Sequence, residues 1–214
     1  VRAGTPVAVP GWTGGPYNLK TMVGNYVLAD EQGVPTEMGR FYDLPVFGLG
    51  GSTDSKVLDH QCGMEATISL MTALLHGANL VHDVGFMDSG LQGSLQLQVM
   101  ANDTIGWLRA ATAGVTVDDE SLALDVIDEL GPEGDYLSHQ HTMRHFREPY
   151  YSQLADKGTH AQWLERGAST MEERAAHQVA NILERHQPEP LPADIRHAVH
   201  KIVQREQAWI DGQN

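Results

Sequence analysis

Two short apolar runs, residues 45–49 and 80–84, each end in a loop rich in glycine and aspartate. A helix-length segment, residues 56–76, separates them. Within it the apolar residues Ala66, Leu70, Ala73 and Leu74 recur at three- and four-residue steps, which predicts one buried helix face. A strand, a crossover helix and a second strand form the unit from which parallel sheets are built. We therefore predict two consecutive βα units in a parallel sheet.

The remaining pattern predicts one more strand and a series of helices. The strand is expected near residues 7–9. Gly33 and Pro35 interrupt a helical composition at residues 25–42, which predicts a broken helix or two short helices there. Strand patterns vanish after residue 134. We therefore predict βα units in residues 1–134 and a helical extension packed on them in residues 135–214. Further helices are expected at residues 93–113, 118–130, 139–146, 161–167, 171–186 and 193–210.

Polar side chains follow both predicted strands of the two units. Ser52, Thr53 and Asp54 follow the first, and His82 and Asp83 close the second. In parallel α/β folds the carboxyl ends of the strands meet at one edge, where ligands bind and reactions occur. The sequence therefore predicts an active-site edge at these loops.

The same region resembles a known family. GGSTDSKVLDHQCGMEA, GANLVHDVGFMDSGLQGSLQ and DDESLALDVIDELGPEGDYLSHQHTMRHFREPYYS are similar to the C-terminal part of the trimethylamine methyltransferase superfamily. The resemblance implies an α/β fold, namely the C-terminal part of a (β/α)8 TIM-type barrel with an appended helical tail. A closed barrel needs eight strands and typically ~250 residues. Because the 214 residues begin with Val1 and contain about three predicted strands, we expect an incomplete barrel.

The resemblance also implies an activity. Members of this superfamily pass a methyl group from an amine to a corrinoid (cobalamin) that a separate corrinoid protein carries, so no permanently bound cofactor is expected. Trimethylamine enzymes of the family have pyrrolysine in the loop that corresponds to residues 51–53, where this chain has Gly51, Ser52 and Thr53. The resemblance therefore favours a non-pyrrolysine member, for which glycine betaine and similar small quaternary amines are the expected substrates. The chemistry agrees, since a quaternary ammonium leaves as a neutral amine without prior protonation.

A quaternary ammonium is held by aromatic faces and negative charge. The catalytic candidates are Asp54, Asp83 and His82, and the substrate-binding candidates are Asp59, Gln61, Glu65, Phe86 and Asp88. Further candidates are Trp12, Tyr17 and Phe47 as aromatic faces, and His82, Lys56 and Gln61 as partners of a substrate carboxylate. Gly50, Gly51, Ser52 and Thr53 are expected to let a corrin ring approach the backbone closely. Acidic residues after strands also cap helices, and that alternative stays open for Asp54, Asp59 and Glu65.

Charge and cysteine content narrow the class of protein. The chain has 28 acidic and 14 basic residues, a net charge of −14, which argues against nucleic acid as a partner. Four lysines in 214 residues favour a halophilic source, with an ordinary acidic cytosolic enzyme as the alternative. A single cysteine, Cys62, excludes a disulfide framework and fits the cytoplasm. We expect no membrane span, and a homo-oligomer is compatible with the sequence.

Three residues invite other chemical interpretations. His141 and His145 are four residues apart and would share a helix face, but the sequence offers no third ligand and no cysteine pair, so no metal site is predicted. Cys62 lies near a helix start, where the dipole would lower its pKa, while the alternative is a small buried packing residue.

Three functions compete. The leading hypothesis is a corrinoid-dependent methyltransferase. The second is a non-catalytic or split-gene subunit that needs a partner chain to complete the barrel. The third is a (β/α)-barrel enzyme of another reaction, since a fold does not determine a function.

Overall fold

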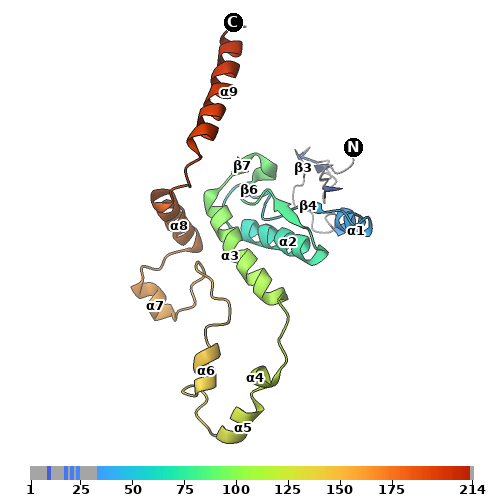
Figure 1. The fold of residues 1–214 in the computed structure, drawn as a ribbon. Helices are drawn as coiled ribbons and strands as arrows, with labels where there is room; N and C mark the ends of the chain where they lie inside the picture. The colour runs from blue at the N-terminus through green and yellow to red at the C-terminus, as the bar shows by residue number, and fades with distance from the viewer. Residues whose placement is uncertain (1–8, 11–16, 19, 22, 25–32, 213–214) are drawn as a thin grey trace. The chain divides into compact units, whose positions relative to one another are not determined.

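A computed structural model describes residues 9–10, 17–18, 20–21, 23–24 and 33–212 of the chain (Figure 1). The chain divides into two compact units, Val1–Val179 and Ala180–Asn214. The first unit contains every strand and the candidate active site, and the second contains the end of one helix and the whole of the last.

The first unit contains a parallel sheet of three strands. Its strands are β1 (Val9–Pro10), β4 (Val46–Leu49) and β5 (Leu80–His82), in the order β1-β4-β5. Both neighbours pair with β4 in parallel. Helix α1 (Gly33–Phe41) precedes β4, and α2 (His60–His76) crosses from β4 to β5. The predicted pair of βα units is confirmed, and β1 overlaps the predicted strand near residues 7–9 at Val9.

Helix α2 shows why this segment folds as predicted. Asp59 caps its first turn by accepting a hydrogen bond from the N–H of Cys62, so the helix begins at His60 and not at residue 56. Gly77 ends it in the left-handed conformation (φ +80°), which glycine adopts without strain. Ala66, Leu70 and Ala73 are buried as predicted, whereas Leu74 is exposed.

A small hydrophobic core lies beneath this helix. It is made of the buried residues Cys62, Ala66, Met87 and Leu97, with Leu58 packed against them. This core joins α2 to the segment that follows β5 and to the next helix, α3 (Leu95–Thr112).

Two short antiparallel ribbons were not predicted. One pairs β2 (Tyr17–Asn18) with β3 (Val23–Gly24), and the other pairs β6 (Phe86–Met87) with β7 (Gln92–Gly93) around the 3₁₀ turn Asp88–Gly90. Strands of two residues are too short to produce a period in the sequence, so nothing in the hydrophobic pattern marks them.

The helices follow the predicted segments with two differences. The predicted helix at residues 118–130 is two helices, because Ala123 between them has φ +48° and cannot continue either one. Residues 33–41 form one unbroken helix, since Pro35 lies in its first turn, where a missing N–H is tolerated; residues 25–32 lie outside the described part. The helices after α3 are α4 (Asp119–Leu122), α5 (Leu124–Leu130), α6 (Gln140–His145), α7 (His160–Glu165), α8 (Met171–Arg185) and α9 (Ala193–Asp211).

The first unit extends well past residue 134, where the sequence loses its strand pattern. The buried carboxylate of Asp103 on α3 accepts hydrogen bonds from the Tyr150 hydroxyl (3.0 Å), the Gln153 N–H (3.0 Å) and the Ser152 hydroxyl. Farther along, the Arg174 guanidinium on α8 donates to the carbonyl of Leu154 (2.6 Å). These contacts bind the following segment to α3, so the compact unit ends at Val179. Within the described residues, no helix combines the length and the apolar character that a membrane crossing needs.

Candidate active site

The loops after β4 and β5 are joined to each other along their backbones. Because β4 and β5 are parallel, the two loops begin at the same edge of the sheet. Backbone hydrogen bonds between the loops continue the pairing beyond the ends of the strands. The Gly50 N–H donates to the His82 carbonyl (3.2 Å), and the Gly85 N–H donates to the Gly51 carbonyl (2.9 Å). The Thr53 N–H donates to the Phe86 carbonyl (2.9 Å), and the Asp88 N–H donates to the Ser55 carbonyl (3.0 Å). The predicted edge therefore holds the polar residues of both loops together.

Glu65 on α2 fixes the loop after β4. Its Oε2 accepts hydrogen bonds from the Thr53 hydroxyl (2.6 Å) and the Asp54 N–H (2.8 Å), and its Oε1 accepts one from the Gln61 amide (2.9 Å). Both carboxylate oxygens thus have partners within the chain. Glu65 and Gln61 were predicted to bind substrate. In the structure Glu65 holds the loop that carries Asp54, and Gln61 donates to Glu65.

Asp59 has the role of a helix cap. Its Oδ1 accepts hydrogen bonds from the Cys62 N–H and the Ser55 hydroxyl, both at 3.0 Å. The Cys62 N–H is the main reason that the pKa of Asp59 lies below its ordinary value. The contacts of Asp59 therefore support a role as the cap of α2, the alternative that the sequence left open.

His82 and Asp83 form a close polar pair at this edge. His82 Nδ1 lies 2.8 Å from Asp83 Oδ1, and the imidazole stacks on the Phe47 ring with centroids 4.3 Å apart and planes at 20°. Side chains alternate along a strand, and Val46 lies against Gly39 of α1. Phe47 and His82 therefore share the sheet face that points away from α1. The sequence could not decide which face His82 takes.

Asp54 and Asp88 belong to a second polar group at the same edge. The Ser89 hydroxyl donates to Asp54 Oδ1 (3.0 Å), and Lys56 Nζ lies 3.3 Å from Asp88 Oδ1 and 2.7 Å from the Asp54 carbonyl. Asp83, Asp88 and Ser89 all have positive φ, at +66°, +52° and +56°. Such conformations cost energy in non-glycine residues and cluster at ligand sites.

The four residues expected beside a corrin ring, Gly50, Gly51, Ser52 and Thr53, are all buried within the chain. A Cβ on Gly50 would lie 3.0 Å from the Val81 side chain, and one on Gly51 would lie 3.1 Å from that of Val84. The close approach that these glycines permit is therefore made by the chain itself. Among the buried side-chain polar groups of the described residues, the Ser52 hydroxyl lacks a hydrogen-bond partner.

Ser69 was not among the predicted site residues, yet its side chain supports the glycine turn. Its hydroxyl accepts a hydrogen bond from the Gly51 N–H (3.0 Å) and donates one to the Ala66 carbonyl (3.1 Å). A hydroxyl on the otherwise apolar face of α2 is the only sign of this role in the sequence.

The aromatic candidates and the Cys62 thiol differ in burial and in how far the structure describes them. Phe86 is half-exposed, with 39% of its surface accessible. Trp12 lies outside the described residues, and only the backbone of Tyr17 is described. Cys62 is buried, which raises the pKa of its thiol to about 11, and the charges of Asp59 and Glu65 add to this effect. Cys62 is therefore a small buried packing residue, which was the alternative interpretation of the sequence.

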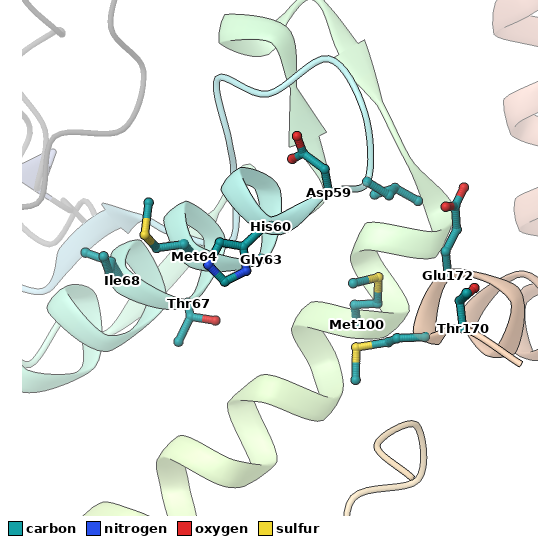
Figure 2. Close-up of a pocket in the computed structure, with 11 residues that line it drawn as sticks. Asp59, His60, Gly63, Met64, Thr67, Ile68, Met100, Thr170 and Glu172 are labelled. Carbon is teal, nitrogen blue, oxygen red and sulfur yellow. The ribbon is translucent and has the colours of Figure 1, made fainter. Parts of the chain in front are cut away.

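A groove of about 650 Å³ lies between α2, α3 and the start of α8 (Figure 2). Met64 of α2, Met100 of α3 and Met171 of α8 give it an apolar lining. Of the predicted site residues only Asp59 lines it. The groove is therefore distinct from the His82–Asp83 pair.

Comparisons with known proteins place the chain in a family. The profile of the family described as trimethylamine methyltransferase (MTTB) matches residues 22–210. The chain is 33% identical over 187 residues to trimethylamine methyltransferase MttB of Desulfitobacterium hafniense, which covers 87% of this chain and 38% of that protein. It is 34% identical over 161 residues to a glycine betaine methyltransferase of the same species (74% and 33%). Against trimethylamine methyltransferase MttB of Methanosarcina thermophila it is 30% identical over 159 residues (74% and 33%). The chain thus spans between a third and two fifths of the length of these relatives.

Proposed function

The chain belongs to the trimethylamine methyltransferase family, and from this premise we propose that it forms part of a methyltransferase acting on a small quaternary amine such as glycine betaine. The observation that carries the proposal is the group formed by Phe47, His82 and Asp83 at the carboxyl edge of the sheet. It combines an aromatic surface with a carboxylate, and a quaternary ammonium requires both because it has no N–H to donate.

The loop after β4 supports a quaternary substrate over a tertiary one. In the transfer the acceptor forms a bond to the methyl carbon, and the electron pair of the broken C–N bond leaves with nitrogen. A quaternary ammonium then departs as a neutral amine, whereas a tertiary amine must first be protonated or otherwise activated. Gly51, Ser52 and Thr53 supply no electrophilic group for that activation.

The proposal gives Lys56 a role toward the other end of a betaine. Its side chain is 62% exposed and its ammonium lies beside Asp88, so it can exchange that partner for a substrate carboxylate. Asp83 would hold the cationic end and Lys56 the anionic end. Asp54 would orient this region through Ser89.

The methyl acceptor in this proposal is a corrinoid carried by a separate protein, and it is a second substrate. Because residues 50–53 are buried, they do not form an exposed cradle, and we assign no contact between them and a corrin ring.

The open sheet supports a larger barrel. β1 and β5 are the edge strands of the described sheet, and Phe47 and Leu80 on its face are 41% and 58% exposed. We propose that further strands cover this face and complete a (β/α)8 barrel. If a separate chain supplies them, the protein is a subunit that requires this partner, which is the alternative function.

Methyl transfer to free Co(I) cobalamin tests the proposal. The purified chain is incubated without oxygen with glycine betaine, and with trimethylamine in parallel, and methylcobalamin is followed by absorbance. We expect product from glycine betaine alone. Asp83→Asn should lower the rate about tenfold, since loss of a partly desolvated charge contact costs about 1–2 kcal/mol. Asp128→Asn, an exposed carboxylate on α5, is the matched control and should leave the rate unchanged.

The outcomes separate the hypotheses. Product from trimethylamine but not from betaine would contradict the quaternary substrate. Activity that arises only when the remaining part of a relative is added as a second chain would select the partner-requiring subunit. Silence under both conditions would overturn the methyltransferase.

A further inference from the structure

Three side chains with metal-binding atoms meet between α4 and α6. Glu120 comes from α4, and His141 and His145 lie one turn apart on α6. One ligand atom from each lies within 4.8 Å of the other two. His145 Nε2 is 3.0 Å from Glu120 Oε1, and His141 Nε2 is 3.9 Å from the same oxygen. We propose that Glu120, His141 and His145 bind a divalent transition-metal ion, with Zn²⁺ as the first candidate.

The donor set and its spacing fit Zn²⁺. Two imidazoles and one carboxylate, with a water in the fourth position, form an established zinc set. Metal–ligand bonds of ~2.0–2.1 Å in a tetrahedron place two donor atoms about 3.3 Å apart. The measured separations of 3.0 and 3.9 Å lie on either side of this value. Small side-chain rotations would therefore complete the site.

The surroundings orient one of the two imidazoles as a metal site would. Glu148 Oε1 lies 2.5 Å from His145 Nδ1, so the carboxylate holds the ring and leaves Nε2 directed at Glu120. Pairs of a ligand histidine with an outer carboxylate are typical of metal sites. The side chains of His141 and His145 are 19% and 31% exposed, which leaves one side open for the ion and its water.

Three existing contacts must be released when the ion binds. His145 Nε2 donates to Glu120 Oε1, so this nitrogen must lose its proton before it can become a ligand. His141 Nε2 lies 2.7 Å from the Glu120 carbonyl, and this ring nitrogen has to lose its proton to become a ligand. Arg144 lies 2.9 Å from Glu120 Oε1 and competes with the ion for that oxygen. Its side chain is 60% exposed, so it can turn into solvent. We therefore expect Arg144 to weaken metal binding.

The third ligand explains why the sequence predicts no metal here. Glu120 lies 21 residues before His141, and a separate short helix carries it, so no local spacing joins the three. A bound ion would connect α4 to α6. None of the three residues belongs to the carboxyl edge of the sheet, and the proposal is independent of the methyltransferase.

Zinc titration of the chelator-treated protein tests the site. Zn²⁺ is added in competition with a chromophoric chelator, and Co²⁺ absorption then reports the coordination geometry. We expect one ion per chain and a loss of affinity above tenfold in His141→Ala, His145→Ala and Glu120→Gln. Glu148→Gln should weaken binding 10- to 100-fold, as changes in outer partners of metal ligands do. His197→Ala, an exposed histidine on α9, is the control and should bind as the unchanged protein does.

Arg144→Gln distinguishes a metal site from a group of ion pairs. A metal site predicts tighter zinc binding when the competing guanidinium is removed, whereas an ion-pair group predicts only lower stability. The conservative Glu120→Gln and Glu148→Gln variants retain hydrogen-bonding side chains, so they report on binding even if a histidine variant fails to fold. Zinc binding that is no tighter than in the His141→Ala/His145→Ala double variant would overturn the proposal.

Discussion

Cys62 shows at the scale of one residue how burial outweighs position in a helix. It lies in the first turn of α2, where a helix dipole favours a thiolate, yet burial raises the pKa of its thiol to about 11. Only about one thiol in a thousand is then ionised at pH 8. We expect the native protein to resist iodoacetamide at pH 8 and to react rapidly in denaturant, as measured by mass spectrometry. Equal rates in both states would contradict the buried thiol.

The residue scale is also where the sequence predicts least. Asp59 and Glu65 were recognisable as acidic groups near a predicted strand end, but their partners include the N–H groups of Cys62 and Asp54. Every residue except proline has such an N–H, so no sequence pattern reveals which one is used. The face of His82 depends on the register of β5 against β4, which a run of three residues leaves undetermined.

Helix α2 permits a test with opposite signs at two of its glycines. Gly77 has φ +80°, so Gly77→Ala should lower the free energy of unfolding by about 1–2 kcal/mol. Gly63 lies inside the helix, and a Cβ added there meets nothing within 4 Å, so Gly63→Ala should raise it by about 0.5–1 kcal/mol. Urea unfolding of both variants measures the difference. Two shifts of the same sign would contradict the described end of the helix.

At the scale of elements, length decides what the sequence can predict. Helices α2, α3, α8 and α9 are long enough for caps and apolar periods to be read, and each lies within a few residues of its predicted bounds. The break at Ala123 depends on one positive φ in a residue that ordinarily favours helices. The ribbon of β6 and β7 depends on pairing between two-residue strands. Neither the break at Ala123 nor this ribbon is marked by a local pattern in the sequence.

The net charge of −14 governs the behaviour of the whole molecule in salt. Like charges repel one another in the compact state, and the screening length falls from about 10 Å at 0.1 M salt to about 3 Å at 1 M. We expect the midpoint of thermal unfolding to rise between these NaCl concentrations. Replacing the acidic residues of α5 by their amides should reduce the rise. A midpoint that falls with salt would contradict self-repulsion as a major cost of folding.

The backbone bonds between the loops after β4 and β5 restrict how this protein can change during evolution. Surface loops usually accept insertions and deletions. Here Gly85, Thr53 and Asp88 each donate to the opposite loop, so an extra residue in either one would shift these three pairs out of register. The lengths of the two loops are therefore coupled. Relatives with a different substrate preference are expected to reach it by exchanging side chains at this edge while keeping both lengths.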